Sequence, residues 1–232
     1  MGTTEKTRIF VLLFSLLVLL VVCYIAVVVY QRNKSMTEGM SVRTNIVFIG
    51  DSQLNNENYV PANKSVPYLV KQQIETVFNF ATDGATITDL YDQMESIPAS
   101  LNLDKKSSCV FISGGGNDIL DSPTRVNIAT LFEKLMSFIK TFKSKFTQIE
   151  HIVVLNLYQP ANPKYDTYRK MIDEWNHLLD EHSTDIGNPY RVANVHDIVA
   201  GPTDFVYGIE PSVVGGEKIA NLIIEMSKTV VN

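Results

Sequence analysis

Cysteine is scarce in this chain, which has two among 232 residues. Cys23 lies inside a long apolar run, so Cys109 has no partner for a disulfide within the rest of the chain. Cys109 begins a second apolar stretch, where a cysteine usually packs as a small hydrophobic side chain. The sequence therefore excludes a disulfide scaffold, and the stability of the fold must come from its hydrophobic core.

Clustered metal ligands and clustered positive charge are also missing. The four histidines are not grouped with cysteine at the spacing of metal ligands, and Asp118 is better explained as a turn-stabilising carboxylate. We therefore predict no metal and no cofactor. The chain carries a net charge of -5, and residues 1–44 contribute +3, which leaves -8 for the remainder. An acidic domain without a basic stripe argues against nucleic acid as a partner.

One apolar run is long enough to cross a membrane. Residues 9–30 contain no charge, and about 20 such residues span a hydrocarbon core as a helix. No small-residue cleavage site follows, so we predict a retained signal anchor between a tail at residues 1–8 and a polar tether at residues 31–44. Basic residues flank the run on both sides and do not fix its orientation. We favour an extracytoplasmic or lumenal domain, in which the sequons at Asn33 and Asn63 could be glycosylated.

Residues 45–232 alternate between strand and helix patterns. Period and composition predict strands over 45–49, 109–113, 151–157 and 190–195, with an extended piece over 78–86. They predict helices over 68–78, 87–94, 124–146, 165–182 and 213–230. This alternation indicates a single α/β domain, a three-layer α/β/α sandwich around a parallel sheet.

Polar or glycine-rich turns follow three of the expected strands. They are Gly50-Asp51-Ser52, Asp83-Gly84-Ala85 and Gly115-Gly116-Asn117-Asp118. The carboxyl ends of parallel strands meet at one edge, where ligands bind. A hydroxyl from Ser52, with an amide from Asn117, would supply a nucleophile and an oxyanion donor for acyl transfer. The alternative for each turn alone is structural, since Asp51 and Ser52 are also favoured cap and turn residues.

In order and spacing, these three blocks resemble those of the SGNH (GDSL) hydrolases, over about residues 45–230. The resemblance implies a flavodoxin-like α/β/α fold with Ser52 as nucleophile in the Gly-Asp-Ser motif that includes Asp51. It also implies an oxyanion hole formed by the Ser52 backbone, Gly84 and Asn117.

The fourth block of the family, Asp-x-x-His, is altered here. Its frame survives, but Tyr207 stands in place of the acid and Glu210 in place of the base. The first block also has Asn56 where the family has a later glycine. Glutamate, with a pKa of about 4.3, is a weaker base than histidine at about 6.5 unless burial raises its pKa.

A different base is the alternative to Glu210. His196 lies just past the last expected strand, with Asp197 or Asp204 available to orient it. The histidine could also be an ordinary loop residue.

Two hypotheses about function follow. The first is a membrane-anchored esterase or acyltransferase that acts on an ester-bearing small molecule, lipid or glycan through Ser52 and an unusual base. The second is a catalytically inactive member of the fold that uses the pocket, or its surface, as a binding module.

Overall fold

The computed structural model describes residue 24 and residues 45–103, 108–121, 126–147, 149, 151–183 and 187–230. The chain divides into residues 1–41 and a compact domain over residues 42–232. The anchor predicted at residues 9–30 lies outside the described residues, apart from Tyr24. In the described part, no helix has the length and apolar character that crossing a membrane requires.

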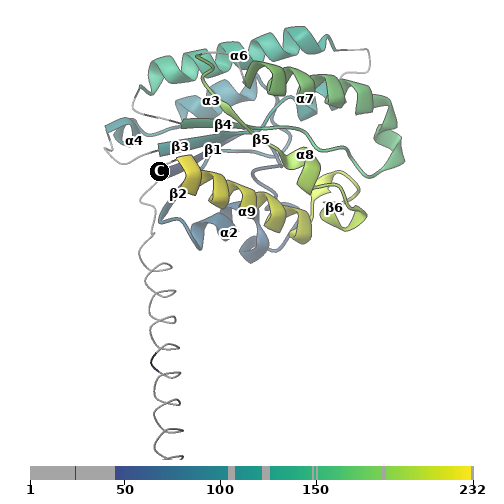
Figure 1. Cartoon of the computed structure of the whole chain (residues 1–232), viewed down its shortest axis with the longest axis horizontal. Coiled ribbons are helices and arrows are strands. Elements are labelled where there is room, and N and C mark those ends of the chain that lie inside the picture. Colours follow the sequence, from purple (N-terminus) through teal and green to yellow (C-terminus); the bar gives the residue numbers. More distant parts are fainter. Residues whose placement is uncertain are drawn as a thin grey trace, which may run out of the picture. The chain divides into compact units, whose positions relative to one another are not determined.

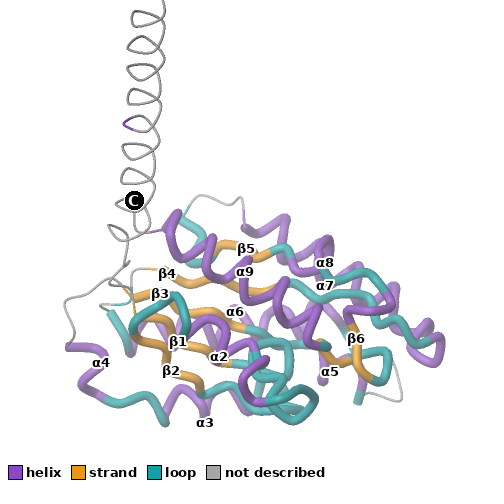
Figure 2. Tube along the Cα trace, turned by 90° about the horizontal axis from the view of Figure 1, so that it is seen from below, coloured by secondary structure: helices purple, strands orange, loops and turns teal. Residues whose placement is uncertain are grey.

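The domain is built on a five-stranded parallel sheet (Figure 2). Its strands are β1 (Asn45–Ile49), β2 (Thr76–Asn79), β3 (Ser108–Ile112), β4 (His151–Leu155) and β5 (Arg191–Ala193). They pair in the order β2-β1-β3-β4-β5, which is the flavodoxin-like order. The expected parallel α/β sheet is therefore confirmed.

Helices cover both faces of this sheet (Figure 1). One face packs against α3 (Asp89–Glu95), α6 (Ile128–Lys145) and α7 (Arg169–Ser183), and the other against α2 (Val66–Lys71) and α9 (Val213–Val230). In β1, Val47 and Ile49 belong to the first core, while Ile46 and Phe48 belong to the second. Because both faces are covered, the whole strand is apolar and buried.

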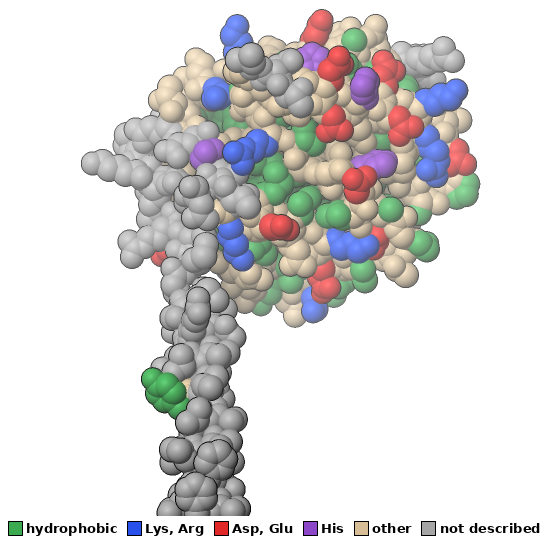
Figure 3. Space-filling view, viewed as in Figure 1, with side chains coloured by type: hydrophobic (Ala, Val, Ile, Leu, Met, Phe, Trp, Pro, Cys, Tyr) green, Lys and Arg blue, Asp and Glu red, His purple; other side chains and the backbone are tan. Residues whose placement is uncertain are grey.

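Shorter elements complete the domain. They are α4 (Ala99–Leu103), α5 (Gly116–Leu120), α8 (Val195–Ile198), the 3-10 helices η1 (Ala62–Lys64), η2 (Pro163–Tyr168) and η3 (Pro202–Asp204), and the strands β6 (Phe205–Val206) and β7 (Glu210–Pro211). On the face shown in Figure 3, acidic and basic side chains are interspersed, with hydrophobic side chains between them.

One local prediction was wrong, and one pair of strands was not predicted. The helix expected over residues 68–78 ends at Lys71, and Thr76–Asn79 forms β2, which pairs with β1. β-branched and aromatic side chains in this segment fit a pleated edge better than a helix. The antiparallel hairpin of β6 and β7 was missed because strands of two residues leave no detectable period.

Candidate active site

Ser52 lies on the loop that follows β1, and this loop is fixed to the end of β3. The Ser113 hydroxyl donates to Asp51 Oδ1 at 2.7 Å and accepts from the Asp51 backbone N–H at 2.9 Å. Gly50 has φ of +148°, and a Cβ at this position would lie 2.1 Å from Ser113 Oγ, so only glycine fits. Asp51 Oδ1 also accepts from the Gln53 N–H at 3.0 Å. The position of Ser52 is thus set by buried hydrogen bonds on both sides.

Gln93 of α3 holds the same loop from the other side. Its Oε1 accepts from the Gly50 N–H at 2.7 Å, and its Nε2 donates to the Gly50 carbonyl and to Thr82 Oγ1, both at 2.9 Å. No motif in the sequence points to Gln93 as a residue of the site. The available signal was a glutamine on the apolar face of a short amphipathic helix, where a buried amide requires partners.

The loop after β3 supplies Asn117 at the start of α5. Asn117 Nδ2 donates to the Ala85 carbonyl at 3.0 Å, which joins this loop to the one after β2. Asp118 Oδ2 accepts from the Ile87 N–H at 2.9 Å, in keeping with a turn-stabilising carboxylate. Gly115 has φ of +91°, and a Cβ there would lie 2.6 Å from the Trp175 ring. The tight packing of the loop on Trp175 therefore requires glycine.

Glu210 reaches the site on the hairpin of β6 and β7. The turn that joins them has positive φ at both Tyr207 (+53°) and Gly208 (+75°), as in a type I′ turn. The hairpin places Glu210 in one pocket with Ser52 and Asn117. The structure thus brings together the predicted nucleophile and one of its two predicted bases.

The environment of Glu210 favours its neutral form. Burial raises the pKa of this carboxyl, the Ser52 hydroxyl opposes the shift as a hydrogen-bond partner, and the charges of Asp83 and Asp51 raise the pKa further. Glu210 Oε2 is buried and has no hydrogen-bond partner. A carboxyl group with a raised pKa is a better proton acceptor near neutral pH than an ordinary glutamate.

Two buried polar side chains hold the hairpin in place. Asn56 Nδ2 donates to the Pro211 carbonyl at 3.1 Å, and Asn56 Oδ1 accepts from the Val66 N–H at 2.9 Å. Asp204 Oδ2 accepts from the Gly201 N–H at 2.8 Å and lies 2.7 Å from Lys218 Nζ. Glu210 is therefore positioned by contacts with α2 on one side and α9 on the other.

His196 lies elsewhere, on α8. Its Nδ1 is 3.1 Å from Asp197 Oδ1, and its backbone N–H donates to Asn156 Oδ1 at 2.9 Å. The ring is partly exposed, and His196 is not among the residues that line the pocket around Ser52. Asp204, the other proposed partner of His196, is engaged with Lys218.

Gly84 also lies outside the pocket that contains Ser52. It has φ of +76° and lines a neighbouring hollow of about 500 Å³ together with Asp83, Ala85 and Gln93. The hydrogen bond from Asn117 to Ala85 places the two hollows next to each other.

The pocket around Ser52 is small, with a cavity volume of about 40 Å³. A polar wall contains Asp51, Ser52, Gln53, Asn117 and Glu210. The rest of the lining is mostly apolar, with Leu120, Leu157, Tyr158, Pro160, Ile172 and Ile209. Among the residues that the structure describes, no group of three or more His, Cys, Asp or Glu side chains could hold a metal ion. Burial raises the pKa of the Cys109 thiol to about 12, in keeping with a packing role.

A flavodoxin-like domain with a serine after β1, an asparagine after β3 and a polar residue from a carboxyl-terminal hairpin defines the class of α/β/α serine hydrolase folds. The family model of the GDSL-like lipases/acylhydrolases matches residues 35–219, and the chain belongs to this family. The resemblance seen in the sequence is thereby confirmed.

Solved structures share the fold at low sequence identity. A lipolytic protein of the G-D-S-L family from Veillonella parvula has a TM-score of 0.61 and 19% identity, over 78% of this chain and 97% of its own. A GDSL-like lipase from Bacteroides thetaiotaomicron has a TM-score of 0.63 and 15% identity, over 86% of this chain and 97% of its own. An acetylxylan esterase from Geobacillus stearothermophilus has a TM-score of 0.59 and 15% identity, over 81% of this chain and 96% of its own. The search of curated proteins found no match.

Proposed function

We propose that this protein is a serine esterase in which Glu210 serves as the base that a histidine supplies elsewhere in the family. One observation carries the proposal: Glu210 and Ser52 meet in one pocket that Asn117 also lines. The most direct support for substrates is the family itself, whose members include lipases and acylhydrolases. The substrate class is therefore an ester-bearing small molecule, lipid or glycan.

The proposed reaction has two steps. Ser52 Oγ attacks the ester carbonyl carbon while its proton passes to Glu210, and the Ser52 N–H and the Asn117 amide stabilise the oxyanion. The ester C–O bond then breaks, and Glu210 returns the proton to the departing alcohol. Water next attacks the acyl-Ser52 carbonyl and gives its proton to Glu210. The serine leaves with that proton as the carboxylic acid is released; an alcohol in place of water would make the protein an acyltransferase.

The test uses the full chain in neutral detergent, with a fluorophosphonate probe and a short-chain aryl ester. Ser52→Ala should abolish labelling and turnover. Glu210→Gln keeps the shape of the side chain but removes its basicity, and we expect kcat to fall about 10²- to 10⁴-fold. His196→Ala serves as the matched control and should retain wild-type rates.

Two results would argue against this proposal. Turnover that survives in Glu210→Gln but is lost in His196→Ala would move the base to His196. A folded wild-type chain that neither labels nor hydrolyses any ester would favour the inactive binding module instead. The replacement of both the acid and the base, with Tyr207 exposed to solvent, is the observation that supports this second candidate.

A membrane anchor at residues 9–30 is part of the proposed function. It would hold the esterase domain at a membrane, with the domain on the extracytoplasmic or lumenal side. The support for it is the uncharged apolar run in the sequence.

A further inference from the structure

The hollow beside the Ser52 pocket (the entrance) is acidic. Asp83, Asp89 and Asp92 line this entrance, while Asp51 and Glu210, whose pKa values are both raised by burial, line the pocket itself. Neither hollow has a Lys or Arg among its described lining residues. Carboxylates of one sign at the mouth of a low-dielectric cleft attract cations and repel anions.

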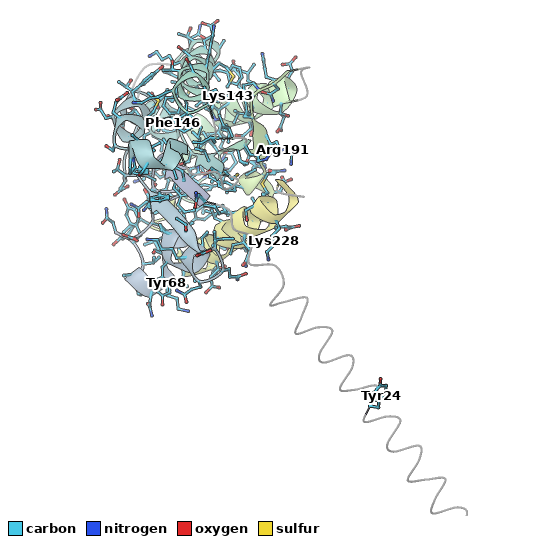
Figure 4. The ribbon with its side chains drawn as sticks, turned by 90° about the vertical axis from the view of Figure 1, so that its left-hand side faces the viewer. Tyr24, Tyr68, Lys143, Phe146, Arg191 and Lys228 are labelled. Carbon is cyan, nitrogen blue, oxygen red and sulfur yellow. The ribbon has the colours of Figure 1, made fainter. Side chains whose placement is uncertain are left out.

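The positive groups nearby are already engaged. Arg169 donates to the carbonyl of Pro160, which lines the pocket, but its guanidinium is also paired with Asp166 at 2.8 Å. Three other basic side chains, Lys143, Arg191 and Lys228, lie at the opposite edge of the sheet, where the strands begin (Figure 4). None of these described basic side chains lines the pocket around Ser52 or the hollow beside it.

Two tyrosines stand at this acidic entrance. The rings of Tyr59 and Tyr207 are 6.4 Å apart, edge to face, and the Tyr59 hydroxyl donates to Asp83 Oδ2 at 2.7 Å. Tyr207 is 77% exposed, and its left-handed backbone costs roughly 1–2 kcal/mol for a residue that is not glycine. An aromatic face beside a carboxylate is the combination that recognises organic cations.

The pocket around Ser52 contains two buried polar oxygen atoms that have no hydrogen-bond partner. Gln53 is 4% exposed and lines the pocket, and its Oε1 has no hydrogen-bond partner. The same holds for the buried Glu210 Oε2. Gln53 Oε1 is an acceptor at any pH, and Glu210 Oε2 is one when the carboxyl group is ionised. A built polar site therefore lies beneath the acidic entrance.

We infer that the site selects esters whose alcohol portion carries an ammonium cation, which Tyr59, Tyr207 and Asp83 hold at the entrance. The acyl group then faces the apolar wall of a cavity of about 40 Å³, which favours a short chain such as acetyl. This inference rests on the proposed esterase function, because Ser52 must attack the bound ester.

The test compares two esters of nearly equal shape, acetylcholine and its uncharged isostere 3,3-dimethylbutyl acetate. The full chain is assayed in neutral detergent, and each kcat/KM is divided by the rate of that ester with hydroxide to remove intrinsic reactivity. At low ionic strength we expect acetylcholine to be preferred about tenfold. The preference should shrink in high salt, while the rate for the neutral ester stays constant.

Three variants locate the selectivity. Asp83→Asn and Tyr207→Gly should each reduce the ratio of the two corrected rates about threefold or more. The ratio is the readout because Asp83→Asn also lowers the pKa of Glu210, which changes the rates of both esters together. Glycine is chosen at position 207 because it accepts the positive φ. Asp180→Asn on α7 removes the same charge far from the site and should change nothing.

The outcomes separate the inference from the proposed function. Equal corrected rates for the two esters, or hydrolysis of an aryl ester but of neither acetate, would overturn the inference and leave the esterase standing. A preference that is insensitive to salt and to both entrance variants would also overturn it. Failure on all esters, with no fluorophosphonate labelling, would overturn the esterase and the inference together.

Discussion

At the scale of single residues, the proposed mechanism makes the deprotonation of Ser52 depend on the charge of Glu210. Only the carboxylate form accepts a proton, and burial followed by the charges of Asp83 and Asp51 raises the pKa at which that form appears. The kcat/KM of the wild type should therefore rise with pH around a pKa that lies above the ordinary value for glutamate. Asp83→Asn removes one of the raising charges, so its pH profile should shift to lower pH.

The control for this prediction is Asp180→Asn, which removes a charge at a distance and should leave the profile in place. A profile that stays fixed in Asp83→Asn would mean that another group supplies the base.

The same carboxyl group links stability to pH. A pKa raised by folding means that the folded state binds the proton more tightly, so its contribution to stability is greatest at low pH. This contribution is lost as the pH rises from the pKa of Glu210 in the unfolded state through its higher pKa in the folded state. Glutamine does not titrate, so the stability of Glu210→Gln does not include this pH-dependent contribution. Relative to the wild type, its free energy of unfolding should therefore rise between acid and neutral pH.

Urea unfolding of both proteins across this pH range measures the difference. A gap between the two curves that does not change with pH would show that the site does not perturb Glu210.

At the scale of elements, the hairpin of β6 and β7 depends on Asn56. This side chain is fully buried and hydrogen-bonds Pro211 and Val66, which belong to elements far apart in the sequence. Asn56→Ala leaves one buried donor and one buried acceptor unpaired. We expect a loss of about 2–4 kcal/mol in the free energy of unfolding, together with lower kcat because Glu210 moves away from Ser52.

Asn63→Ala, at an exposed position on η1, is the matched control and should stay within about 0.5 kcal/mol of the wild type. A loss in Asn56→Ala no larger than in this control would contradict a role for Asn56 in holding the hairpin.

The elements that sequence predicted well are the long ones. The helix expected over residues 213–230 is α9 with the same bounds, and β1 was predicted from its continuous apolar run. These segments carry their period in their own residues. The helix α2 was extended too far because Thr76–Asn79 becomes a strand only by pairing with β1, a contact that no local pattern encodes.

The residues of the candidate site also divide into those that local sequence predicts and those that depend on contacts far along the chain. Ser52 and Asn117 were predicted because strand ends in a parallel sheet converge, and the structure places them in one pocket with Glu210. Glu210 reaches the pocket only through a hairpin of two-residue strands, so its position next to Ser52, and the position of His196 outside that pocket, could not be predicted from the sequence. Gln93 and Ser113 act through hydrogen bonds to the loop after β1, and neither belongs to a motif of its own.

At the scale of the whole molecule, the domain has its own core on both faces of the sheet. It forms one compact unit over residues 42–232. Its single tryptophan, Trp175 of α7, is fully buried and packs against Phe132 of α6. The catalytic groups proposed here all lie within this unit. Residues 42–232 should therefore fold alone and retain the tryptophan fluorescence and ester turnover of the full chain.

The proposed anchor at residues 9–30 leads to a separate prediction, which concerns whether the chain is held in a membrane. An uncharged apolar helix of this length inserts into a bilayer in a way that alkaline carbonate does not reverse, because every residue returned to water would expose apolar surface. After expression in cells, the full chain should sediment with membranes through a carbonate wash, and residues 42–232 should remain in the supernatant. Replacing Leu16 and Leu20 by Lys should move the full chain to the supernatant, because charges at the centre of the run oppose insertion. Release of the unaltered chain by carbonate would rule out a spanning anchor while leaving the esterase proposal intact.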